Sequence, residues 1–256
     1  MKKIAFFCLI FLFSLAGAFA SQSREALTLP AAGCRALDIE CGAGNLKVQG
    51  DDKLERIEVD AVLVVRGIGE SDLPEFKKDH VTLKLEKSGD RAILRALIEE
   101  KFSLENLFGG REAYIDLHVR LPRRLALDID DGSGDCDIRD CDGGLEIEDG
   151  SGDVRLANIM GAVKIDDGSG DLFLTGVGGD VEIEDGSGDI ELKDAGGDVE
   201  IEDGSGQMEV FNVRGSLVID DGSGDIVIDG VEKDVTIEEA GSGDIEINNV
   251  KGRVRK

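Results

Sequence analysis

The residues best placed to do chemistry are carboxylates beside the Gly-Ser-Gly segments in the second half of the chain. The acidic pair Glu148-Asp149 precedes one such segment, and Asp153 follows it. The arrangement returns every eighteen residues, with Gln207 in place of one aspartate and Ala240 inserted before the last segment. Closely spaced carboxylates can bind oxygen-seeking cations, accept hydrogen bonds from turn N–H groups, or act as an acid–base pair on a glycosidic bond.

Calcium is the cation that such an acidic array would hold. If a metal binds, the sequence predicts these ligands: Asp149, Asp153, Asp167, Asp171, Asp185 and Asp189. The spacing differs from the glycine-rich nonapeptide calcium repeat, because Asp153 follows a glycine directly. Bound Ca²⁺ also requires about 6–8 oxygen ligands. We therefore expect capped turns along a solvated acidic edge and no cofactor, with Ca²⁺ binding kept as the alternative.

Catalytic residues are harder to find. A serine recurs in every repeat, so none is singled out as a nucleophile, and both histidines, His80 and His118, lie outside the array. No Ser/His/Asp or Cys/His grouping is visible. We predict no catalytic or cofactor-binding residues and a protein that is not an enzyme. A polysaccharide-acting enzyme built on a β-helix is the alternative, although the aromatic side chains that usually line a sugar groove are almost missing.

The array that positions these carboxylates begins at Leu127. Lines of eighteen residues align an apolar column that starts at Leu127 and a second that starts at Ile129. Apolar and polar residues alternate within each line, which is the periodicity of a β-strand. The Gly-Ser-Gly and Gly-Gly segments supply corners. A fixed period of this kind indicates stacked units. We predict an all-β fold: a β-solenoid of seven stacked coils over residues 127–256.

Residues 21–126 resemble a degenerate coil followed by a β-rich segment that departs from the repeat. The run from Leu37 to Val48 follows the coil template, and strand-like segments follow at 57–65, 81–85, 92–98 and 114–121. A hairpin turn is expected at Ser88-Gly89-Asp90. Residues 71–80 favour a short helix and residues 99–111 a loop. This region is predicted to cap one end of the solenoid within one continuous domain.

The first twenty residues have the build of a secretory signal peptide. Lys2 and Lys3 precede a short apolar run, and Ala18-Phe19-Ala20 is a small-x-small cleavage site. No later segment is apolar enough to span a membrane. We expect an exported protein, periplasmic or at the cell surface, without a transmembrane segment after cleavage.

Composition narrows the choice of partner. The chain carries 55 acidic and 29 basic residues, a formal charge of −26. Residues 127–252 hold 36 of the acidic residues and 7 of the basic ones, so the charge belongs to the array. Such a surface repels phosphate backbones, which excludes nucleic-acid binding. Partner and oligomeric state stay open on this basis.

Four cysteines of the mature chain suit an oxidising compartment. The candidates for disulfides are Cys34, Cys41, Cys136 and Cys141. We favour the pairs Cys34–Cys41 and Cys136–Cys141, with buried free thiols or cross-pairing as the alternatives.

The reiterated Gly-Ser-Gly-Asp, together with the run from Val119 to Pro122 and Leu127-Asp-Ile129, resembles the bacterial putative-adhesin family of toastrack-type repeat domains, whose function is unknown. The resemblance covers about residues 37–250. It implies a solenoid-like fold without catalytic residues and a role at the cell envelope. We therefore expect a structural or adhesin-like binding module whose partner is an envelope protein or a surface glycan.

Overall fold

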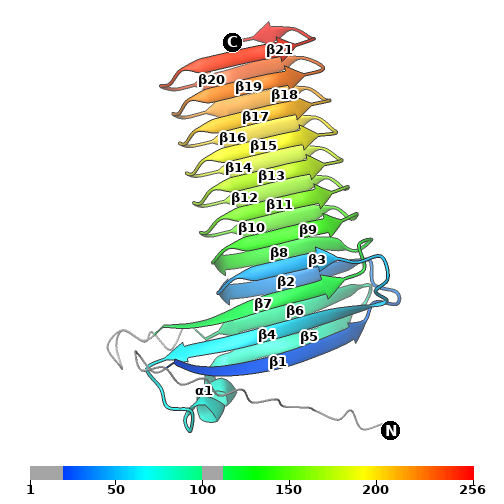
Figure 1. Ribbon diagram of the computed structural model, residues 1–256, viewed down its shortest axis with the longest axis vertical. Coiled ribbons are helices and arrows are strands. Elements are labelled where there is room, and N and C mark those ends of the chain that lie inside the picture. The colour runs from blue at the N-terminus through cyan, green and yellow to red at the C-terminus, as the bar shows by residue number, and fades with distance from the viewer. Residues whose placement is uncertain (1–19, 100–111) are drawn as a thin grey trace.

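The predicted β-solenoid is confirmed. The computed structural model describes residues 20–99 and 112–256, which consist almost entirely of strands. Most of the predicted signal peptide and of the predicted 99–111 loop lies outside these ranges. Coils of eighteen residues stack one above another, starting from a wider N-terminal region (Figure 1).

Two sheets of eleven strands enclose one core. The first sheet contains, in spatial order, β1 (Ala20–Pro30), β4 (Arg56–Arg66), β7 (Ala113–Leu121), β3 (Leu46–Gly50), β9 (Cys136–Cys141), β11 (Val154–Ile159), β13 (Leu172–Val177), β15 (Ile190–Ala195), β17 (Met208–Val213), β19 (Ile226–Val231) and β21 (Ile245–Val250). The second contains β22 (Val254–Arg255), β20 (Val235–Ala240), β18 (Leu217–Asp221), β16 (Val199–Asp203), β14 (Val181–Asp185), β12 (Val163–Asp167), β10 (Leu145–Asp149), β8 (Ala126–Ser133), β2 (Ala36–Ala43), β6 (Arg91–Ile98) and β5 (Val81–Ser88).

Successive coils pair in parallel and in register, apart from one bulge where β18 pairs with β20 after Ile219. Strand β10 aligns with β12 so that Leu145 opposes Val163 and Asp149 opposes Asp167. Because side chains alternate between the two faces of a strand, inward side chains stack along the axis, apolar on apolar and aspartate on aspartate. The aliphatic columns are buried from Leu127 to Ile237. A single coil would leave these side chains in water, and the stack buries them collectively.

The N-terminal region closes one end of the stack. Strands β2 and β3 form the predicted degenerate coil and pair in register with β8 and β9. Strands β4 and β7 pair antiparallel, as do β5 and β6 across the predicted hairpin turn. Helix α1 (Leu73–His80), also predicted, buries Leu73 and Phe76 against this end (Figure 1).

Strand β1 was not predicted. It pairs antiparallel with β4 over its full length. Its side chains offer no apolar stripe, since Ser21 is its buried residue and Leu27 and Leu29 are only half-buried. Backbone pairing with a strand already in the core therefore fixes this segment, and hydrophobic periodicity could not reveal it.

Glycine is required where the second sheet turns into the first. Gly170 has φ +146°, and a Cβ built on it would lie 1.8 Å from the carbonyl oxygen of Gly152 in the coil below. The same conflict recurs at Gly152, where the distance to the Gly134 oxygen is 2.0 Å. Backbones that stack this closely leave no volume for a side chain.

We expect Gly170→Ala to lower the free energy of unfolding by at least about 2 kcal/mol, because a left-handed L-residue costs about 1–2 kcal/mol and the coils must also separate. The control is Gly144→Ala, whose Cβ would meet its nearest atom, the Ala162 carbonyl oxygen, at 3.7 Å. That change should stay within about 0.5 kcal/mol. Urea unfolding followed by circular dichroism measures both, and equal losses would contradict close stacking at the corner.

Candidate functional site

The six predicted carboxylates separate into two columns on either side of the Gly-Ser-Gly corner. Asp153, Asp171 and Asp189 form an outer column after the corner. Asp149, Asp167 and Asp185 belong to an inner column at the ends of the second-sheet strands. The complete inner column is Asp131, Asp149, Asp167, Asp185, Asp203 and Asp221.

The outer column links each coil to the next by hydrogen bonds. Asp153 Oδ1 accepts the N–H of Asp171 at 3.2 Å, and Asp171 Oδ1 accepts the N–H of Asp189 at 3.0 Å. The Arg155 guanidinium, which hydrogen-bonds to Asp153, holds the pKa of that carboxyl below its usual value. These side chains satisfy N–H groups at the corner, as the capped-turn hypothesis predicts.

The inner column is buried, contrary to the expectation of an acidic edge in solvent. Its six side chains are 2–6% exposed. In five of the coils one carboxylate oxygen accepts the backbone N–H of the corner serine two residues on, for example Ser169 to Asp167 at 3.1 Å. The second oxygen, Oδ2, has no hydrogen-bond partner in any of the six.

Burial changes the acidity of this column. It raises the pKa of Asp131 and Asp203 to about 6 and that of Asp149 and Asp185 to about 7. Neighbouring carboxylates add to the rise. Ionised carboxylates about 4.8 Å apart repel by about 0.9 kcal/mol in water and about 3.5 kcal/mol at an effective dielectric constant of about 20. An ionised inner column would therefore be strongly destabilising.

Strand alternation could have revealed the inner column. In the sequence Leu145-Glu-Ile-Glu-Asp149 the inward positions are the first, third and fifth, which places Asp149 inside. The outward acidic position before it varies between Asp and Glu, whereas the inward one is Asp in six coils. Described as one acidic pair, Glu148 and Asp149 hide this difference between an outward and an inward position.

The carboxylates predicted to bind a metal do not form a coordination site among the described residues. No group of three or more His, Cys, Asp or Glu side chains within residues 20–99 and 112–256 could hold a metal ion. The corner serines donate their backbone N–H groups to the inner column, so the repeated Gly-Ser-Gly-Asp serves as hydrogen-bonding structure. Calcium binding stays an untested alternative.

The preferred disulfides are not formed. Cys34, Cys41, Cys136 and Cys141 are buried free thiols. Cys136 and Cys141 are the two ends of strand β9, and its extended part from Cys136 to Arg139 alone spans about 10 Å before the left-handed corner at Asp140, whereas bridged Cα atoms lie within about 7 Å. Extended strand β2 likewise separates Cys34 from Cys41. The alternative of buried free thiols describes the structure.

A column of left-handed residues forms the opposite corner and was missed in the sequence. All seven members have φ between +53° and +84°: Asp140, Asn158, Gly176, Asp194, Asn212, Gly230 and Asn249. These are the residue types that tolerate this backbone conformation. Asn158 and Asn212 donate their side-chain amides to Asp140 and Asp194 at 3.2 and 2.9 Å. The pattern of Asp, Asn and Gly at a period of eighteen was the available signal.

The two outer faces of the solenoid differ in charge. From β8 to β18 the outward positions of the second sheet hold ten acidic residues and one lysine, Lys164. The first sheet presents a mixed face from β9 to β21, with five acidic and three basic outward residues. Its two phenylalanines lie under cations: Arg155 is 5.0 Å from the Phe173 ring and Lys193 is 5.5 Å from the Phe211 ring.

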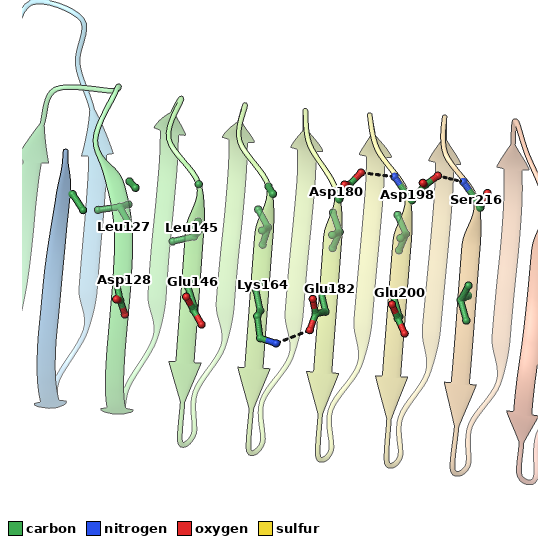
Figure 2. A pocket seen from close by; sticks show the side chains of 18 of the residues that line it. Leu127, Asp128, Leu145, Glu146, Lys164, Asp180, Glu182, Asp198, Glu200 and Ser216 are labelled. Carbon is green, nitrogen blue, oxygen red and sulfur yellow. Dashed lines mark hydrogen bonds and ion pairs between the residues drawn. The ribbon is translucent and has the colours of Figure 1, made fainter.

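A groove of about 710 Å³ runs across the coils beside the acidic face (Figure 2). Small residues such as Ala126, Gly144 and Ala162 line its length. Figure 2 shows Glu146, Lys164, Glu182 and Glu200 side by side in one row. On the other side Asp180 and Asp198 accept backbone N–H groups of the following coils at 2.9 and 2.7 Å. The groove therefore draws its lining from successive coils.

Comparison with known proteins identifies solved structures with a similar fold, but it identifies no related sequence. No family model matches the chain, and no curated protein does. A crystal structure described as a putative lipid-binding protein from Parabacteroides distasonis has a TM-score of 0.51 and 11% identity, over 92% of this chain and 96% of that one. The two chains share a fold. At this identity the similarity shows nothing of function.

Other solved structures that match the chain are described as putative adhesins or as a putative cell adhesion protein. A putative adhesin from Bacteroides fragilis has a TM-score of 0.46 and 12% identity, over 91% of this chain and 96% of that one. A putative cell adhesion protein from Clostridium sporogenes has a TM-score of 0.33 and 13% identity, over 92% and 98%. In the part of the chain that the structure describes, no helix is long and apolar enough to cross a bilayer.

The outer column gives a direct test of its hydrogen-bonding role. We expect Asp171→Ala to cost about 1 kcal/mol of unfolding free energy, because the N–H of Asp189 loses its acceptor. Asp171→Asn keeps an acceptor oxygen and should stay within about 0.5 kcal/mol of the original chain. Urea unfolding of the three proteins measures the difference. Unchanged stability in the alanine variant would show that the outer column does not hold the coils together.

Proposed function

We propose that the protein is an exported, non-enzymatic, adhesin-like binding module of the cell envelope. In this proposal the solenoid is a rigid platform, and its partner is a surface glycan or an envelope protein. The cell surface or the periplasm is its place of action, as the signal-peptide segment predicts. The proposal is based on the chain's own surface.

The groove beside the acidic face is the observation that carries the proposal. It crosses strands from β8 to β18 and is lined by residues from each coil, so it suits an extended ligand better than a compact one. Carboxylates such as Glu182 and Glu200 are acceptors for the hydroxyl groups of a saccharide or for the N–H groups of a peptide. The in-register stack repeats these acceptors about every 4.8 Å.

Charge reversal in the groove tests the proposal. Glu182→Lys combined with Glu200→Lys changes the row shown in Figure 2 without touching the core, since both side chains are exposed. The matched control is Glu191→Lys combined with Glu209→Lys, which makes the same change on the outward face of the first sheet. Labelled protein is applied to a glycan array and to isolated bacterial envelope fractions.

We expect the original chain and the first-sheet control to bind, and the groove variant to bind at least about tenfold more weakly, which corresponds to about 1.4 kcal/mol. Loss of binding in the control alone would move the site to the other face. Absence of binding by the original chain to every glycan and envelope fraction would contradict the proposed function.

A further inference from the structure

We propose that the inner aspartate column is a proton-binding site, in which the folded protein takes up protons from solvent and holds buried carboxyls as neutral acids. The ligand is the proton itself. This inference concerns the interior of the solenoid and does not depend on what the outer faces bind.

The inner carboxyls lack hydrogen-bond donors for at least half of their oxygen atoms. The six carboxyls stand in one file, since Asp131, Asp149 and Asp167 oppose one another across β8, β10 and β12 and the register continues to Asp221. Each has an Oδ2 atom without a partner. Ionised carboxylates are acceptors only, so neighbours in such a file cannot satisfy one another. A neutral acid carries both a donor and an acceptor, and a file of acids can form a chain of hydrogen bonds.

Among the described residues, the inner column also lacks a nearby positive charge that would stabilise ionised carboxylates. The groups that face the column from the strand below it and from the first sheet are the thiols of Cys41 on β2 and Cys136 on β9. The remaining groups that act on it are carboxylates before and after the corner: Asp130, Asp166, Asp220, Asp153, Asp171 and Asp189. Within residues 20–99 and 112–256 no lysine, arginine or histidine is among the main groups that act on it.

A metal ion is a poor substitute for the proton in this column. The described residues form no group of three or more ligands. One oxygen of Asp149 is already engaged by the N–H of Ser151, and the same holds in the next four coils. A proton needs a single oxygen and no coordination shell, so it can occupy each carboxyl separately.

The pH dependence follows from the direction of the shifts. Burial raises the pKa of Asp149 and Asp185 to about 7 in the folded protein, whereas an aspartate in an unfolded chain titrates near 3.9. Between these values the folded state binds more protons than the unfolded state. The stabilisation is complete below about pH 4 and is lost as the pH rises through about 7.

The test compares isosteric replacements in the two columns. The inner variant carries Asp149→Asn, Asp167→Asn and Asp185→Asn, and the outer control carries Asp153→Asn, Asp171→Asn and Asp189→Asn. Both remove the same number of carboxyls and keep an acceptor oxygen beside each N–H group. Urea midpoints are measured from about pH 5 to about pH 8, together with proton uptake on refolding at about pH 6.

We expect the midpoint of the original chain and of the outer control to fall as pH rises, and refolding to take up more than about one proton per molecule. The inner variant should lose most of both effects. An inner variant that keeps the original slope and proton uptake would overturn the proposal.

A spectroscopic measurement covers the case in which the inner variant does not fold. Infrared difference spectra of the original chain between about pH 5 and about pH 8 should show the carbonyl band of neutral carboxylic acids disappearing across the window in which the inner column titrates. A spectrum in which all carboxyls of the folded protein are already ionised at about pH 5 would overturn the proposal.

Discussion

In-register stacking of one repeated cross-section is the constraint on which the rest of the structure depends. Each coil contributes inward aliphatic side chains that are worth little alone, and the free energy of burial is gained only when the next coil covers them. The register of the aliphatic positions must then be maintained from coil to coil, because a slip of one position there would turn these side chains outward. The two corners of each coil must then have a fixed backbone geometry. Glycine is needed where two backbones approach each other, and Asn, Asp or Gly is needed where φ is positive.

Stacking like on like has an electrostatic consequence. The same kind of residue recurs in most coils, so an acidic position becomes a row of mostly acidic residues along the axis. The structure deals with its rows in different ways. Carboxylates of the outer column accept N–H groups from the next coil, and those of the second-sheet face lie in solvent. The inner column has neither a full set of donors nor a counter-charge, which makes it the feature of the interior that most needs an explanation.

Much of the fold could be predicted because a period of eighteen is visible without any structure. The period placed the coils, the alternation placed Leu145 and Ile147 inside, and the Gly-Ser-Gly segments placed the corners. The features that could not be predicted depend on contacts between segments, which the period of the sequence does not reveal. Strand β1 is fixed by backbone pairing with β4, and strands β2 and β9 separate Cys34 from Cys41 and Cys136 from Cys141, which keeps the preferred disulfide pairs apart. The sequence identified the residues of the candidate site, but it did not show which of them are buried and which face solvent. Asp149 and Asp153 are four residues apart, yet one is buried and the other caps a turn.

The stacking itself is tested most directly by distances between spin labels placed on one outward column. Labels at Asp130 and Glu202 are four coils apart, and labels at Asp130 and Asp220 are five coils apart. Pulsed electron resonance should give mean separations of about 19 and about 24 Å, an increase of about 4.8 Å for each eighteen residues. Separations that do not grow with the number of intervening coils would contradict the solenoid.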